Sequence, residues 1–258
     1  MYIINNCWMS TINYDNMFTN TKEVCAKCAY TNNNLNSSYT ELMCAIQHGS
    51  IDLVRQLCNE GADVNEKSAC GYTPLIMACG RGSFELVLEF YIKGAHINDE
   101  DNCGRTALIK ACETGNLNIV TALCNMGANI NHHGVDGFTA LMGASFYGHI
   151  DVVRELISRG ARINDVMIDD DGWNALMWAC MQGHLDIVRE LCNKGVDVHM
   201  ISDSNENAMT VATEHNHLDI ICELIQRGVT LIEYEEEDED ENEMDFEEED
   251  GMDFEEQD

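Results

Sequence analysis

Two cysteines near the start of the chain have a spacing that occurs in metal and redox sites. Cys25 and Cys28 are separated by two residues, as in a CxxC motif. A zinc ion would need two more ligands at a suitable spacing, but only Cys7 is nearby and the first histidine is His48. A redox motif of this kind would need a βαβ pattern around it, and the sequence has none. We therefore interpret the pair as part of a polar arm, with a metal or redox role as the weaker alternative.

Other candidate catalytic residues are equally sparse. His132 and His133 are adjacent in an expected loop and would bind a metal only weakly. The acids in residues 165–171 lack the alternating pattern and the distant glutamate of an EF-hand. The sequence carries no nucleophile elbow, P-loop, kinase motif set, HExxH or dinucleotide fingerprint. It therefore predicts a protein that is not an enzyme, with no catalytic, cofactor-binding or metal-binding residue.

A regular spacing of glycines organises most of the chain. Six glycines lie 33, 33, 33, 35 and 33 residues apart, namely Gly61, Gly94, Gly127, Gly160, Gly195 and Gly228. Two further registers, one between the expected helices and one at the expected turns, repeat at nearly the same interval. A period of about 33 residues is typical of an array of helical units, in which each unit packs only on its neighbours.

The start of the first helix in each unit carries the most specific motif. It reads TPLI from Thr73, TALI from Thr106, TALM from Thr139 and NALM from Asn174. With the period, these motifs resemble the ankyrin repeat family, although the histidine of the family's TPLH is replaced in every unit. The resemblance implies an all-α repeat solenoid of helix-turn-helix units joined by β-hairpin loops. We predict six repeats, at residues 38–70, 71–103, 104–136, 137–171, 172–204 and 205–231.

Composition limits the compartment and the classes of partner. The formal net charge is -32 at pH 7, which excludes nucleic acid because phosphate binding needs clustered Lys and Arg. No apolar run approaches the ~18 residues of a membrane span, so no membrane contact is expected. Most of the 13 cysteines take small apolar places of the repeat. Cys79 and Cys112 are examples, and this placement predicts reduced, buried thiols in a cytoplasmic or nuclear protein. We also expect the protein to be a monomer.

Both ends of the chain depart from the repeat. Residues 1–37 do not match it, and we predict a partly disordered, Asn-rich arm. The Asn-rich arm and the TALM motifs resemble ankyrin arrays of large DNA viruses and protists. Residues 233–258 hold 18 Asp or Glu and no Lys or Arg, so residues 232–258 are predicted to be a disordered acidic tail. The tail repeats a Met-Asp-Phe-Glu-Glu element, which suits either a linear binding motif or a merely solubilising segment.

One hairpin is longer than the others. Gly160 and Gly172 are 12 residues apart, whereas the equivalent glycines of other units are 10 apart. The extra residues fall within 165–171, where Met167 and Ile168 lie near the expected tip. Loop tips tolerate insertions, but binding residues also concentrate on loops. We therefore take these two residues as candidate contacts, with a neutral insertion as the alternative.

The resemblance also implies where a partner would bind. Ankyrin proteins usually hold partners on a concave surface formed by the hairpin tips and the first helix of each unit. The residues after the turn glycine and before the inter-helix glycine face that surface. The further candidate contacts are therefore Tyr72, Arg81, Arg105, Phe138, Phe146, Tyr147, Trp173 and Met181. The two arginines would orient an acidic peptide. The last five residues form an apolar cluster that would anchor a partner, unless these side chains pack on adjacent hairpins instead.

These observations predict a non-catalytic scaffold or adaptor that binds another protein or peptide on its concave face. The alternative is a protein that binds or chaperones basic proteins through its acidic tail.

Overall fold

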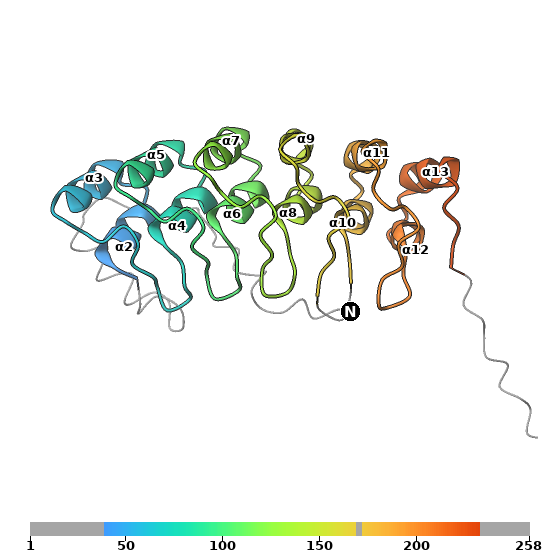
Figure 1. Cartoon of the computed structure of the whole chain (residues 1–258), viewed down its shortest axis with the longest axis horizontal. Helices are drawn as coiled ribbons and strands as arrows, with labels where there is room; N and C mark the ends of the chain where they lie inside the picture. The colour runs from blue at the N-terminus through green and yellow to red at the C-terminus, as the bar shows by residue number, and fades with distance from the viewer. Residues whose placement is uncertain (1–38, 169–171, 233–258) are drawn as a thin grey trace, which may run out of the picture.

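The computed structural model describes residues 39–168 and 172–232 of the chain (Figure 1). Within these ranges it is all-helical, which confirms the predicted repeat solenoid. The arm (residues 1–37) with its CxxC motif, residues 169–171 and residues 233–258 of the acidic tail lie outside the described residues. The twelve helices of the described part are α2 (Glu41–Gln47), α3 (Ile51–Asn59), α4 (Pro74–Gly80), α5 (Phe84–Ile92), α6 (Ala107–Glu113), α7 (Leu117–Asn125), α8 (Ala140–Phe146), α9 (Ile150–Ser158), α10 (Ala175–Gln182), α11 (Leu185–Asn193), α12 (Ala208–Glu214) and α13 (Leu218–Gln226).

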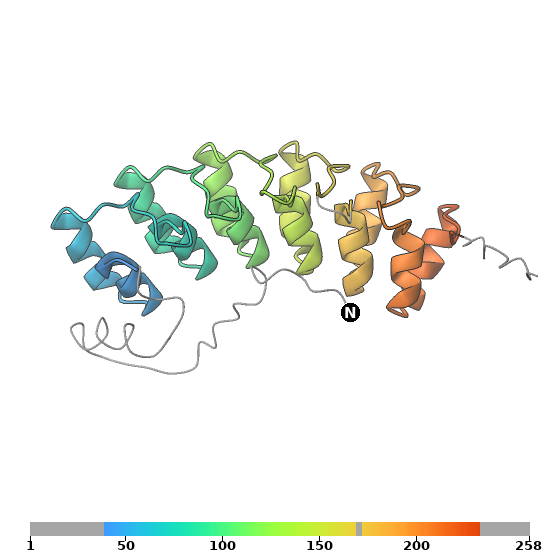
Figure 2. The ribbon, with the colours of Figure 1, turned by 90° about the horizontal axis from the view of Figure 1, so that it is seen from below.

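The helices form two rows. The inner row holds the even-numbered helices and the outer row holds the odd-numbered ones, and each inner helix pairs with the outer helix that follows it (Figure 1; Figure 2 shows the pairs from below). Long loops, here called fingers, join each outer helix to the next inner helix and project beyond the inner row. In the described residues the fingers form only isolated β-bridges, such as Glu100 with Thr106. No helix among the described residues is long and apolar enough to cross a membrane.

The repeated Thr or Asn of the TPLI-type motif starts each inner helix. The Thr73 hydroxyl accepts a hydrogen bond from the backbone N–H of Ile76 at 3.2 Å, which satisfies one of the unpaired N–H groups at the helix start. Pro74 follows at the first helical position, where its missing N–H has no cost. The same side-chain cap occurs at the other five inner helices, from Thr40, Thr106, Thr139, Asn174 and Asn207.

The core runs continuously through the stack, between the two rows and between neighbouring repeats. Apolar residues of each inner helix, such as Leu75 and Leu108, are almost completely buried. Each such side chain contributes about 1.5–3 kcal/mol relative to an exposed position. Cys79, Cys112 and Cys180 are also buried there with free thiols, and burial raises the pKa of each thiol. They therefore act as small apolar side chains, as predicted.

Histidines link the last four repeats. His149, His184 and His217 stand at the N-terminal ends of outer helices, but none makes a side-chain cap there. The Nε2 atom of each lies 3.1 Å from a backbone carbonyl in the inner helix of the preceding repeat; His184 reaches the carbonyl of Phe146, for example. A carbonyl only accepts, so Nε2 carries the proton. Gly148 permits this approach: its φ is +80°, and a Cβ there would lie 2.6 Å from the His184 ring.

Charged side chains link the outer helices. Arg55, Arg154 and Arg189 each reach a glutamate of the next repeat, with N–O distances of 3.7 Å (Arg55), 3.1 Å (Arg154) and 2.8 Å (Arg189). Arg154 also lies 3.7 Å from Asp151, three residues earlier in its own helix. These pairs form a polar ladder along the outer face.

Asparagines link the fingers. The Asn98 amide donates to the carbonyl of Gly127 at 3.3 Å and accepts from the N–H of Asn129 at 2.8 Å. Asn65 and Asn131 make the same two bonds to the repeat that follows each of them. Each of these three fingers is thereby fixed to the repeat that follows it, beside the inner helices.

Candidate functional site

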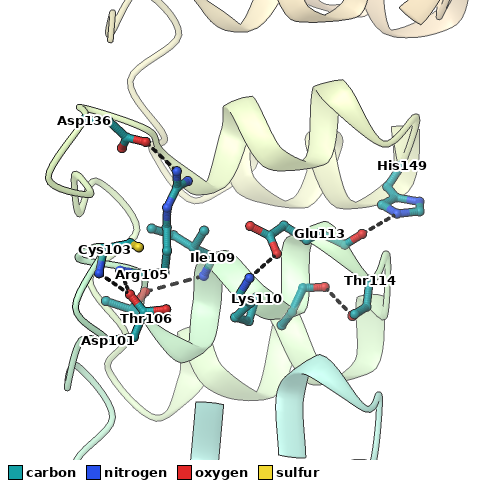
Figure 3. Close-up of polar contacts among 11 residues, drawn as sticks. Asp101, Cys103, Arg105, Thr106, Ile109, Lys110, Glu113, Thr114, Asp136 and His149 are labelled. Atoms are coloured by element: carbon teal, nitrogen blue, oxygen red, sulfur yellow. Dashed lines mark hydrogen bonds and ion pairs between the residues drawn. The ribbon is translucent and has the colours of Figure 1, made fainter. Parts of the chain in front are cut away.

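Arg105 follows a turn glycine, and its side chain lies inside the stack. Its Nη2 atom is 2.6 Å from Asp136 Oδ2 of the next finger, and its guanidinium carbon is 4.0 Å from the centre of the Phe138 ring (Figure 3). Both contacts are favourable for a cation held between a carboxylate and an aromatic face. The prediction that Arg105 is available on the surface is wrong, because the side chain is buried and links two neighbouring repeats.

Phe138, at the equivalent place in the next repeat, is 0% exposed. Its ring lies over Gly143 of α8, where an added Cβ would be 3.3 Å from Phe138 Cε1. The backbone N–H of Phe138 donates to Asp136 Oδ1 at 3.0 Å, which fixes the turn that directs the ring inward. The prediction that Phe138 lies on the exposed surface is therefore wrong. The alternative that we raised, packing within the solenoid, describes this residue.

Trp178 of α10 is the centre of the aromatic cluster, and the sequence interpretation missed it. Its ring lies 6.4 Å from Phe138, 5.3 Å from Phe146 and 4.9 Å from Trp173, measured between ring centres. These separations are within the range of favourable aromatic pairs. The signal was present in the motif: the largest side chain of NALMWAC stands where the preceding repeat has Gly143.

The part of the cluster that reaches solvent is at the end of the inner helices. Tyr147, just after α8, is 41% exposed, and its ring packs at 4.8 Å against the half-buried Phe146. Trp173 is half-buried, and its Nε1–H donates to Glu206 Oε2 of the last repeat at 3.0 Å. Met181 is half-buried at the end of α10. The structure thus places Tyr147 outermost, on a supported aromatic base.

Comparison with known families agrees with this architecture. The family model described as ankyrin repeats (3 copies) matches residues 17–101, 75–167 and 165–234. The chain belongs to the ankyrin repeat family. Ankyrin repeats are generally protein–protein interaction modules, and the family is generally non-catalytic. No curated protein matches the chain. The first match begins at residue 17, within the segment that we had assigned to the non-repeat arm.

A polar pair adjoins the aromatic surface of the ankyrin array. Lys110 Nζ of α6 is 2.8 Å from Glu113 Oε2 (Figure 3). Burial lowers the pKa of Lys110, but the Glu113 carboxylate and Tyr72 together raise it by more. The pKa of Lys110 is therefore raised overall, and the ammonium stays charged. Burial, followed by the charge of Glu113, raises the pKa of Tyr147. The tyrosine hydroxyl is therefore protonated at neutral pH and offers a hydrogen bond, not a nucleophile.

The two remaining candidates beside the inner helices, Tyr72 and Arg81, lie just before and just after α4. Tyr72 is half-buried against the core, and burial raises the pKa of its hydroxyl. Arg81 Nη1 donates to the carbonyl of Gln47 in the first repeat at 2.6 Å. This bond spans two repeats, as the histidine bonds do further along. The structure thus assigns Arg81 a link within the ankyrin array, whereas we had expected it to orient an acidic peptide.

The longer finger presents one of its two candidate residues. Met167 is buried against the core, so its predicted surface position is wrong. Ile168 is 74% exposed, and its backbone N–H donates to the carbonyl of Asp136 in the preceding finger at 2.8 Å. Val135 is equally exposed on that preceding finger, and our prediction omitted it. Two apolar side chains therefore stand at the edge formed by adjacent fingers.

The loop histidines have structural partners. His132 Nε2 lies 3.0 Å from the Gly104 carbonyl, and His133 Nε2 lies 3.0 Å from Asp165 Oδ2 of the next finger. Within residues 39–168 and 172–232, no group of three or more His, Cys, Asp or Glu is placed to hold a metal ion.

Proposed function

We propose that this ankyrin protein is a non-catalytic scaffold or adaptor that binds another protein or peptide on its concave face. The contact is centred on Tyr147, flanked by Phe146, Trp173 and Met181. One observation carries the proposal: Tyr147 is an exposed aromatic residue on a preorganised aromatic base. Aromatic anchors that are held rigidly lose little side-chain entropy on binding.

The chemistry around Tyr147 suggests the kind of ligand. An apolar side chain of the partner would pack on the rings of Phe146 and Tyr147. A polar or charged group beside it would meet the Lys110–Glu113 pair, whose atoms are 2.8 Å apart. Ile168 at the finger edge would cover the other side of the ligand. The ligand is thus an extended or helical segment with an apolar residue next to a polar one, bound by a monomer in the cytoplasm or nucleus.

The test is co-purification with immobilised protein, followed by a binding titration with the partner so identified. The Tyr147→Ala and Met181→Ala double variant removes exposed or half-buried side chains only. Tyr91→Ala is a matched control, because Tyr91 is also an exposed tyrosine but lies on the outer row. We expect at least a tenfold loss of affinity for the double variant, equivalent to about 1.4 kcal/mol, and none for the control. Equal affinities for all three proteins would refute the concave-face contact.

The acidic tail supports a second candidate function, the binding or chaperoning of basic proteins. Its support is the run of 18 acids in residues 233–258. Charge-driven binding weakens steeply with salt, whereas contact with an aromatic surface does not. Deleting residues 233–258 should abolish binding of a basic partner under this alternative. Under the concave-face proposal, the deletion should leave binding of the partner unchanged.

A further inference from the structure

The outer row carries a polar ladder at four of its five described junctions. Arg55, Arg154 and Arg189 each reach a glutamate of the following repeat. Thr121 takes the same place in the third repeat, and its hydroxyl donates to Glu155 at 3.1 Å. A second rung lies beside the first, where Asn59, Asn125 and Asn193 each accept a hydrogen bond from a Lys or Arg of the next repeat at 2.9–3.0 Å.

The ladder is missing between α5 and α7. Leu88 and Ala122 occupy the places of the arginine and the glutamate, and Ile92 and Met126 occupy those of the asparagine and the cation. All four are apolar, so neither rung is present at this junction. A set of substitutions at matched positions is more informative than scattered apolar residues, which any surface carries.

This junction exposes apolar side chains. Ile92 is 77% exposed and Tyr91 is 46% exposed, and Phe84 and Leu117 are exposed as well. On α5, positions 84, 88, 91 and 92 are spaced as one face of a helix. The α5–α7 patch (Phe84, Leu88, Tyr91, Ile92 and Leu117) is on the outer row, whereas the concave surface is formed by the inner row and the fingers (Figure 1).

We propose that residues 1–16 of this same chain dock on the α5–α7 patch. The segment precedes the first residue matched by the ankyrin family model, residue 17, so the repeat pattern does not account for it. Its side chains match an apolar surface: it contains Tyr2, Ile3, Ile4, Trp8, Met9, Ile12 and Tyr14, and Asp15 is its only charged side chain.

Charge favours this segment over the other two occupants that the molecule offers. The acidic tail carries 18 negative charges, and the remainder of the chain carries -32 + 18 = -14. The tail is therefore repelled by the body, and so is a second copy of the chain. Residues 1–16 are nearly neutral and face no such repulsion.

The connection is long enough. Residues 17–38 separate the segment from the start of the described chain, and 22 residues can span up to roughly 75 Å at about 3.4 Å each. Neighbouring helices pack about 10 Å apart, so α5 and α7 are well within reach of a chain anchored at α2. Such a tether also gives an effective concentration in the millimolar range, which favours an intramolecular contact over a weak bimolecular one.

Site-specific photo-crosslinking on the full chain tests the docking. Benzoylphenylalanine replaces Ile92, and in a control it replaces Ser158, which holds the equivalent place in the fourth repeat. We expect Ile92 to yield an intramolecular crosslink to a peptide within residues 1–16, and Ser158 to yield none. A crosslink from position 92 to a second copy or to another segment, or no crosslink at all, would overturn the proposal.

Two further variants separate docking from chance proximity. Trp8→Ala leaves the repeats untouched and should abolish the crosslink from position 92. The Leu88→Arg and Ala122→Glu pair restores the first rung with the residue types of Arg154 and Glu190, and should abolish it too while the circular dichroism stays unchanged. A crosslink that persists at full yield in the Trp8→Ala chain would contradict an apolar contact.

Discussion

Two rows of residues, distinct from the two rows of helices, border the concave side of this molecule, and they have different roles. The row after the turn glycines contains Arg105 and Phe138, which are buried and hold neighbouring repeats together. The row before the inter-helix glycines contains Tyr147, which is exposed. Both rows contain aromatic residues, and Trp173 of the first row is half-buried, but the most exposed aromatic side chain of the two rows is Tyr147 of the second row. Chemical type alone therefore does not show which residues of a repeat array are exposed; the packing of each position against the next repeat does.

Phe138→Ala gives the largest effect that we expect. It removes a fully buried ring and leaves a cavity beside Trp178, and it also removes the aromatic face under Arg105. A loss of about 3–5 kcal/mol in the free energy of unfolding is expected. Urea denaturation followed by circular dichroism measures it. A loss below about 1 kcal/mol would mean that this row is not part of the core.

Gly148→Ala tests the histidine links beside the exposed row. The new Cβ would lie 2.6 Å from the His184 ring, and the residue has a φ of +80°. The left-handed backbone alone costs an alanine about 1–2 kcal/mol, and displacing the ring should cost more.

Gly127→Ala is the control for that experiment. Its φ is +90°, but a Cβ there would meet nothing within 4 Å. We expect Gly148→Ala to be the more destabilising by about 1 kcal/mol, because it also breaks the bond from His184 to the Phe146 carbonyl. Equal thermal unfolding midpoints for the two variants would show that the histidine link adds nothing.

Ser145→Cys tests a buried position of α8, two residues before the exposed Tyr147. Ser145 is 0% exposed, and its hydroxyl has no hydrogen-bond partner among the residues that the structure describes. Cys112 and Cys180 occupy the equivalent places in the adjacent repeats. Burial without a hydrogen bond costs a thiol less free energy than it costs a hydroxyl. We therefore expect Ser145→Cys to raise the free energy of unfolding by about 1 kcal/mol, measured by thermal or urea denaturation. Ser145→Ala should lower the free energy of unfolding by no more than the small cost of a cavity one atom in size.

Tyr147→Ala should have the smallest effect on stability, within about 0.5 kcal/mol, because the side chain is largely in solvent. Differential scanning fluorimetry is sufficient to measure it. A loss comparable to that of Phe138→Ala would place Tyr147 in the packing of the repeats and remove it from the candidate contact surface.

The sequence was sufficient for the fold and for part of the site. The glycine period and the capped TPLI-type motif predict the helix pairs, because each is a local signal repeated in register. Tyr147 and Ile168 are exposed, as expected of candidate contacts. Phe138 and Met167 do not, because the period places a residue in its register without showing whether the next repeat covers it.

Links between repeats were the least accessible to sequence reasoning. Arg189, for example, binds Glu223 of the next repeat at 2.8 Å, and no motif within either helix indicates this pair. That hydrogen bond and the one from Arg227 lower the pKa of the Glu223 carboxyl. Such pairs depend on the rotation between successive units, which a single sequence does not encode locally. Trp178, in contrast, was visible as the bulkiest residue at its place in the motif, and a position-by-position comparison of the repeats would have found it.

Hydroxyl-radical footprinting with mass spectrometry tests the difference between the two rows most directly, because it reports the solvent exposure of individual aromatic side chains. The account predicts rapid oxidation of Tyr147 and strong protection of Phe138 in the folded protein, with Tyr147 becoming protected when a concave-face partner binds. Similar oxidation of the two residues, or rapid oxidation of Phe138, would contradict it.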